Sequence, residues 1–149
     1  MREEKVTKEI IKKLKQNDWF IFSFDFPQSG TGCLILPDNS NGNKNKDSII
    51  PDIIAIKNNV CVFFENKDRI VVSDFDKVNS LITNNLYINN INKLLKNYNI
   101  KDYYYGIGLP DNINLKKLDG LLNKTDFVLL VKELNYQLVN YYDKYNLFN

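Results

Sequence analysis

The feature that most constrains the fold is a predicted β-hairpin near the middle of the chain. Two apolar runs rich in β-branched and aromatic residues, Ile53 to Ile56 and Val60 to Phe64, flank Asn58 and Asn59. Asparagine tolerates the positive φ angles of a two-residue hairpin turn, so this pair is expected to form the turn. In that register residue 57 faces 60, 56 faces 61, 54 faces 63 and 52 faces 65.

The predicted register brings charged side chains together at the open end of the hairpin. Asp52 falls opposite Glu65, and opposed residues of an antiparallel pair have Cβ atoms about 4.5–5.5 Å apart. Side chains alternate along a strand, so Lys67 points to the same face about 6.6 Å further on. Two carboxylates suit Mg²⁺, which keeps several waters and takes phosphate oxygens as further ligands. A neighbouring ammonium can orient or deprotonate the attacking water and offset charge on the phosphorus.

The spacing of these residues resembles a known nuclease signature. Pro51-Asp52, twelve intervening residues and Glu65-Asn66-Lys67 after an apolar strand are similar to the PD-(D/E)xK pattern. The resemblance implies that Asp52, Glu65 and the main-chain carbonyl of Asn66 bind Mg²⁺, for which Mn²⁺ would substitute. It also implies that Lys67 serves the hydrolytic water. The segment IIPDIIAIKNNV is similar to archaeal Holliday-junction resolvases and to some type II restriction endonucleases, and the match covers about 22 residues.

The same residues have a simpler interpretation, a solvated charge run from Glu65 to Arg69 at a strand end. Pro-Asp also occurs at Pro37-Asp38 and Pro110-Asp111, and Glu3-Glu4-Lys5 also fits E-x-K. The first of these Pro-Asp pairs opens a polar run, and the second ends a strand as a turn signal. Only the central pattern has two strands in matching register, and this favours a site.

A helix is predicted before the hairpin and bears on the metal site. Val6 to Gln16 has apolar residues at helical spacing, with lysines on the other positions. Many PD-(D/E)xK nucleases add a helix-borne glutamate to the metal site, but the resemblance places Thr7 at that position. Glu3, one turn earlier on about the same face, and Glu9, nearby but off that face, are the alternative ligands. Each is equally explained as a solvated helix acid.

Two loops supply candidate contacts to DNA. In resolvase relatives a loop rich in serine and glycine faces the DNA backbone, and Pro27 to Gly32 resembles it. A plain connecting loop explains that segment nearly as well. The polar run from Asp38 to Ser48 carries lysines that would touch DNA or simply keep the loop soluble. The candidate contacts are Gln28, Ser29, Thr31, Lys44 and Lys46.

The remaining apolar patterns predict an α/β fold. Their order is α-β-β-β-α-β-α-β-α, which favours a restriction endonuclease-like mixed sheet flanked by helices in a single domain of 149 residues. The other expected elements are a strand at 19–26, a helical stretch from Ser73 to about Tyr98 broken near Asn84-Asn85, a strand at 103–109, a helix at 115–122, a strand at 127–131 and a final helix at 134–145.

Composition excludes several classes of function. The chain has no histidine, which removes Ser-His-Asp and Cys-His hydrolases and histidine metal centres, and its two cysteines are too few for a cysteine zinc site. A net charge of +2 means that any DNA affinity must be local. No apolar run approaches the roughly 20 residues of a membrane span, and no signal-peptide pattern is present, so a cytoplasmic protein without a membrane partner is expected.

The sequence therefore predicts a Mg²⁺-dependent DNA endonuclease, of the type II restriction kind, that cuts duplex DNA. The family resemblance implies that the products carry a 5′-phosphate. Cutting both strands needs two active sites, so a homodimer, or a catalytic subunit with a partner protein, is expected. One alternative is a Holliday-junction resolvase, favoured by IIPDIIAIKNNV and disfavoured by Thr7. Another is a non-catalytic DNA-binding or assembly module that keeps the nuclease-like fold.

Overall fold

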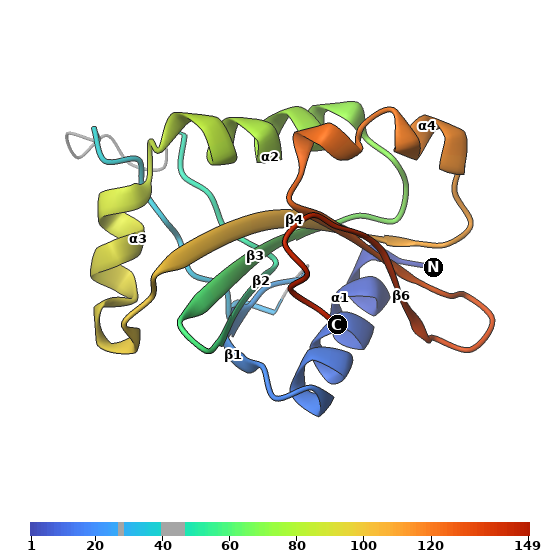
Figure 1. Ribbon diagram of the computed structural model, residues 1–149, viewed down its shortest axis with the longest axis horizontal. Helices are drawn as coiled ribbons and strands as arrows, with labels where there is room; N and C mark the ends of the chain where they lie inside the picture. The colour runs from blue at the N-terminus through green and yellow to red at the C-terminus, as the bar shows by residue number, and fades with distance from the viewer. Residues whose placement is uncertain (27–28, 40–46) are drawn as a thin grey trace.

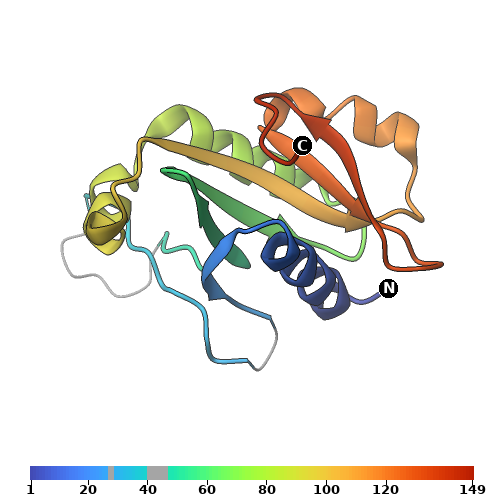
Figure 2. The ribbon, with the colours of Figure 1, turned by 60° about the horizontal axis from the view of Figure 1, so that its bottom comes forward.

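The computed structural model describes residues 1–26, 29–39 and 47–149. It is an α/β protein in which six strands form one mixed sheet, with helices on both faces (Figure 1 and Figure 2). In chain order the elements are α1 Glu3–Gln16, β1 Phe20–Phe24, β2 Ile53–Lys57, β3 Val60–Asn66, α2 Val72–Asn84, α3 Ile88–Leu94, η1 Lys96–Tyr98, β4 Asp102–Pro110, α4 Leu115–Asp119, η2 Leu122–Lys124, β5 Phe127–Val131 and β6 Leu138–Asp143.

The strands lie side by side in the order in which they occur along the chain. The first three are antiparallel neighbours, β3, β4 and β5 are parallel, and β6 runs antiparallel to β5. Parallel neighbours need a crossover connection, which α2 and α3 supply between β3 and β4 and α4 supplies between β4 and β5. The ends of β3, β4 and β5 therefore share one edge of the sheet.

The β2–β3 hairpin confirms the predicted turn and the predicted register from residues 57 and 60 to residues 53 and 64. Asn58 and Asn59 have φ angles of 50° and 67°, the conformation that a type I′ turn requires at both central positions. Lys57 pairs with Val60, and the ladder continues to Ile53 opposite Phe64. One position further on, the Asp52 N–H donates to the Phe64 carbonyl at 2.9 Å, so the strand contact reaches the candidate acid.

Each face of the sheet has its own apolar core. On one face α1 buries Val6, Ile10 and Leu14 against side chains of β2, β3 and β5. On the other face α2, α3 and α4 bury side chains such as Phe75 and Leu118 against alternate residues of the same strands (Figure 1). Alternation of side chains along a strand explains why β2, β3 and β5 are apolar on both faces.

The prediction of a helix at 134–145 is wrong. This segment turns at Tyr136, whose φ is 59°, and then forms β6, which pairs with β5 from Val131–Leu138 to Phe127–Asp143. Valine and tyrosine fit a pleated surface, and without this pairing β5 would expose an unpaired edge. Tertiary pairing therefore overrides the helical spacing.

The long helical stretch is divided, as expected, near Asn84-Asn85. Asn85 adopts a left-handed conformation with φ of 49° and ends α2, a role that asparagine fills more readily than most residues. At its other end α2 begins at Val72, one residue before the predicted start. None of the helices in the described segments has the length and apolar character that crossing a bilayer requires.

Candidate functional site

Three of the predicted site residues lie together at the open end of the β2–β3 hairpin. Asp52 immediately precedes β2, Glu65 is the penultimate residue of β3, and Lys67 follows β3. Each pair among the three interacts electrostatically. The hairpin thus brings two carboxylates and one ammonium into one cluster, as its register predicts.

Asp52 is the most buried carboxylate of this cluster, with 8% of its surface exposed. Its Oδ2 accepts the main-chain N–H of Asn66 at 2.6 Å, and its own carbonyl accepts the N–H of Asp25 at 2.8 Å. Burial and the neighbouring Glu65 carboxylate raise its pKa from 3.8 to about 8, although the hydrogen bond from Asn66 opposes the shift. A cation at this position would favour the ionised carboxylate.

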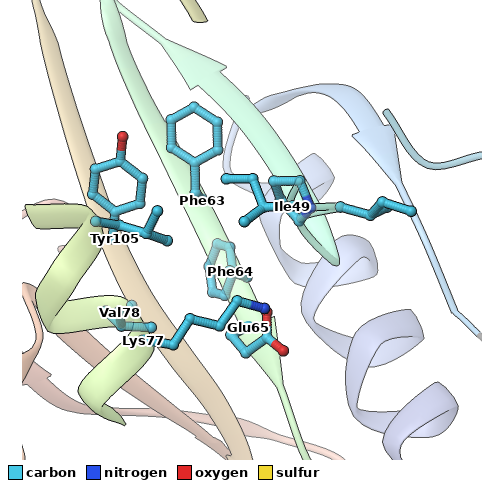
Figure 3. Close-up of a pocket in the computed structure, with 11 residues that line it drawn as sticks. Ile49, Phe63, Phe64, Glu65, Lys77, Val78 and Tyr105 are labelled. Carbon is cyan, nitrogen blue, oxygen red and sulfur yellow. The ribbon is translucent and has the colours of Figure 1, made fainter. Parts of the chain in front are cut away.

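Glu65 lies between the sheet and α2. Its Oε2 is 3.5 Å from the Nζ of Lys77, and its side chain is 16% exposed. Figure 3 shows Lys77 extending from α2 to this carboxylate, beside apolar side chains such as Phe63 and Val78 that line the same pocket. Burial raises the pKa of Glu65, and Lys77 and Lys67 oppose that rise. Glu65 is therefore a second carboxylate whose charge depends on nearby cations.

Lys67 is held as a cation by the acids around it. Burial lowers the pKa of its ammonium, but surrounding carboxylates outweigh burial and raise the pKa overall. These carboxylates are Asp74, Glu3, Glu65 and Asp52. The Lys67 N–H donates to the Gly108 carbonyl at 3.0 Å, which ties the backbone at this point to β4. A fixed ammonium suits orientation of a water and stabilisation of negative charge.

The two candidate acids of α1 have different surroundings. Glu3 is close enough to raise the pKa values of Asp52 and Lys67, so the first turn of α1 approaches the cluster. Glu9 instead pairs with Lys5 at 2.8 Å and lines a groove that α1 forms with residues 135–137. Of the two glutamates, only Glu3 is placed to contribute to the site.

The structure adds two residues that sequence reasoning missed, Asp74 and Lys77 of α2. Asp74 interacts electrostatically with both Glu65 and Lys67, and one of its carboxylate oxygens, Oδ2, is buried without a hydrogen-bond partner among the described residues. Their spacing of three places both on one side of a helix. This spacing is the only sign in the sequence that Asp74 and Lys77 lie together. It does not show which side of α2 faces the sheet.

The donor set fits Mg²⁺ better than a metal enclosed by protein ligands. Within residues 1–26, 29–39 and 47–149, no cluster of three or more Cys, Asp or Glu has an arrangement that could hold a metal ion. Asp52 and Glu65 supply two carboxylates, and Asn66 supplies a carbonyl beside them. Mg²⁺ is commonly bound by one or two carboxylates with water and substrate phosphate as its other ligands. Burial raises the pKa values of both acids, as expected for two buried carboxylates that lie close together.

The loop after β1 approaches Asp52 through its backbone. Ser29 Oγ donates to Asp25 Oδ1 at 3.1 Å, and Thr31 Oγ1 donates to the Phe24 carbonyl at 2.7 Å. Both hydroxyls therefore make hydrogen bonds inside the loop, while Asp25 joins the loop to Asp52. The other proposed DNA contacts, Gln28, Lys44 and Lys46, lie outside the described residues.

Comparisons with protein families, with curated proteins and with solved structures found no match for this chain. The chemistry of the site is therefore inferred from its own geometry. That geometry is a buried acid, a second acid between two lysines, and a backbone carbonyl at the end of one central strand.

Proposed function

We propose that the chain is a Mg²⁺-dependent DNA endonuclease of the PD-(D/E)xK type, with a restriction endonuclease-like fold, that hydrolyses phosphodiester bonds in duplex DNA. The observation that supports this most is the electrostatic interaction of Asp52 with Glu65 at the open end of the hairpin, with Lys67 beside them. Burial raises the pKa of both acids, so each is poised to gain from a bound divalent cation.

Each residue of the cluster has a distinct role in this proposal. Asp52, Glu65 and the Asn66 carbonyl would hold Mg²⁺, and Mn²⁺ would substitute for it. When bound, the ion supplies Lewis-acid activation of the phosphodiester and of water. Lys67 orients the attacking water and offsets negative charge that develops on the phosphoryl oxygens. Lys77 holds the Glu65 carboxylate from the side of α2.

The topology supports a site at this edge. Ligands of α/β sheets bind beyond the carboxyl ends of parallel strands, and Glu65, Asn66 and Lys67 lie where β3 ends beside the parallel strand β4. The other residues beside this end of β3 come from α1, from α2 and from the start of β2. Cutting both DNA strands requires two such sites, so we propose that the enzyme acts as a homodimer or with a partner protein.

The Holliday-junction resolvase is the less favoured nuclease. Thr7 is fully buried and accepts a hydrogen bond from Asn66, so the helix position that carries an acid in many relatives has a structural partner instead. Four-way junctions and linear duplexes offered side by side separate the two functions. A resolvase would cut only the junction, at a symmetric pair of points.

The proposal is tested by plasmid cleavage in Mg²⁺ with variants Glu65→Gln and Lys67→Ala. Each is expected to reduce the cleavage rate by about a hundredfold or more, since each removes a group that acts on the reacting phosphate. Glu9→Gln and Lys101→Ala are matched controls, because Glu9 pairs with Lys5 and Lys101 lies beside the hairpin turn at the opposite end of β3.

The outcomes of that assay separate the candidate functions. Undiminished cutting by both site variants would exclude the assignment of the site. If neither the wild type nor the variants cut the plasmid but all of them bind DNA, the result would favour the non-catalytic module. Loss of cutting in the two site variants but not in the two controls would support the endonuclease.

A further inference from the structure

Thr7 and Asn66 form a buried polar pair that links α1 to the end of β3. The Asn66 Nδ2 donates to Thr7 Oγ1 at 3.0 Å, and both residues have 0% of their surface exposed. The two residues are 59 positions apart in the chain, so the bond is a purely tertiary contact. Leaving either partner of such a buried hydrogen bond unpaired costs free energy. The bond between Thr7 and Asn66 therefore favours a single geometry.

Asn66 also connects this pair to the site through its main chain. Its N–H donates to Asp52 Oδ2 at 2.6 Å, and the N–H of the next residue, Lys67, donates to the Gly108 carbonyl at 3.0 Å. The carbonyl between these two N–H groups belongs to Asn66 and is the proposed metal ligand. The Asn66 N–H and the Asn66 carbonyl belong to the two successive peptide groups that share the Asn66 Cα, so the backbone conformation of Asn66 affects both the Asp52 carboxylate and that carbonyl.

The space around the Asn66 side chain leaves it little freedom. A Cβ at Gly108 would lie 2.3 Å from Asn66 Oδ1 and 2.4 Å from Ile10 Cδ1, so only glycine leaves room for the amide there. Asn66 Oδ1 has no hydrogen-bond partner among the described residues. Among the described residues, the Thr7 hydroxyl is thus the hydrogen-bond partner of this amide, and the close approach of Gly108 restricts the amide further.

We propose that Thr7 and Asn66 are positioning residues for the metal site, where Thr7 anchors the Asn66 side chain and so fixes the peptide that holds Asp52. The inference rests on the proposed nuclease function. It gives Thr7 a role different from that of a helix acid, because Thr7 acts through Asn66 and does not ligate the ion. Groups that orient metal ligands typically change metal affinity by about 10- to 100-fold when removed.

The test measures Mn²⁺ binding by titration calorimetry. It compares two pairs of proteins, and within each pair the side chains at position 7 differ mainly by the hydroxyl. Threonine and valine have nearly the same shape, so Thr7→Val removes the hydroxyl and leaves Asn66 Nδ2 unpaired. We expect Mn²⁺ affinity to fall about tenfold. Thr7→Ser, which keeps the hydroxyl and loses a methyl, should restore most of the affinity.

Thr7→Ala provides the second pair, to be compared with Thr7→Ser. Both lack the methyl and differ only in the hydroxyl, so the pair remains informative if Thr7→Val does not fold. Thr125→Val is the matched control, since Thr125 is also buried and donates its hydroxyl to a single carbonyl, that of Leu122, at 2.9 Å. This control should lose stability as Thr7→Val does but keep wild-type Mn²⁺ affinity.

The results separate this inference from the proposed function. Equal Mn²⁺ affinity in Thr7→Ser and Thr7→Ala, or in wild type and Thr7→Val, would overturn the positioning role while plasmid cutting by the wild type still upheld the nuclease. Mn²⁺ binding that depends on Asp52 and on the Thr7 hydroxyl, without any DNA cutting, would uphold the positioning role and reject the nuclease. Absence of Mn²⁺ binding by the wild type would overturn the positioning role directly.

Discussion

Asp52 and Asp126 are two buried aspartates that share a position before a strand and one kind of hydrogen bond. They are 8% and 5% exposed, and each precedes a central strand of the sheet. Each carboxylate accepts a main-chain N–H from the neighbouring strand, at 2.6 Å from Asn66 and at 3.0 Å from Tyr105. Burial raises the pKa of both. The same contact of a carboxylate with a main-chain N–H therefore occurs twice, once between antiparallel strands and once between parallel strands.

The nearest charges distinguish the two aspartates. Asp126 has Lys144 nearby, which lowers its pKa and partly compensates for burial. Asp52 has the Glu65 carboxylate as its strongest electrostatic neighbour, and this raises its pKa further. A buried carboxylate with a cation beside it needs no further partner for its charge. Two buried acids that lie together need additional positive charge. This contrast is why Asp52, and not Asp126, is proposed as a metal ligand.

The largest expected difference is in DNA cutting. Asp52→Asn should reduce Mg²⁺-dependent plasmid cleavage by about a hundredfold or more, because it removes a proposed metal ligand. Asp126→Asn keeps an oxygen that can accept the Tyr105 N–H and should cut at nearly the wild-type rate. Equal losses of cleavage rate in Asp52→Asn and Asp126→Asn would show that the two aspartates do not differ in function.

The next largest effect is stabilisation by a metal ion. At a Mn²⁺ concentration about a hundred times its dissociation constant, a single bound ion stabilises the folded protein by about 2.7 kcal/mol. Thermal unfolding should show this gain in wild type and in Asp126→Asn. It should be largely absent in Asp52→Asn. A gain of equal size in Asp52→Asn would place the ion elsewhere.

The dependence of stability on pH should follow the raised pKa of Asp52. The folded protein holds this proton up to about pH 8, whereas the unfolded chain releases it near 3.8. The stabilising contribution is therefore complete below the unfolded value and is lost as pH rises through the folded value. Without metal, denaturant unfolding should show lower stability at pH 8 than at pH 5. Asp52→Asn should flatten this slope more than Asp126→Asn does.

The smallest effect concerns the cation beside Asp126. Lys144 is exposed, so solvent screens its interaction with the carboxylate. Lys144→Met should change the free energy of unfolding by no more than about 0.5 kcal/mol and leave DNA cutting unchanged. A loss of cutting in this variant would mean that the Asp126 region contributes to function after all.

The region around the hairpin was accessible to prediction because its determinants are local. Asn58 and Asn59 favour the positive φ angles of the turn, and the alternation of side chains then sets Asp52 against Glu65. The segment at 134–145 was not accessible in this way. Leu134, Leu138, Tyr141 and Tyr145 have the spacing of a helix, yet pairing with β5 makes 138–143 a strand.

The surroundings of the two candidate carboxylates, Asp52 and Glu65, depend on contacts that no local pattern encodes. Glu3 and Glu9 are equally acidic residues of one helix, and only the packing of α1 on the sheet brings Glu3 within reach of Asp52. Lys77 reaches Glu65 because α2 packs against the sheet at β4, the strand next to β3. These contacts join residues that are distant in the chain, so they follow from the assembled sheet.

The amino-acid sequence alone determined the turn, the strand register and therefore the meeting of Asp52, Glu65 and Lys67, because turn chemistry and side-chain alternation act over a few residues. Only the tertiary structure decided that β6 is a strand, that Thr7 binds Asn66, and that Lys144 lies near Asp126. The physical reason is that burial and charge–charge distances exist only once α1, α2 and the six strands have packed together.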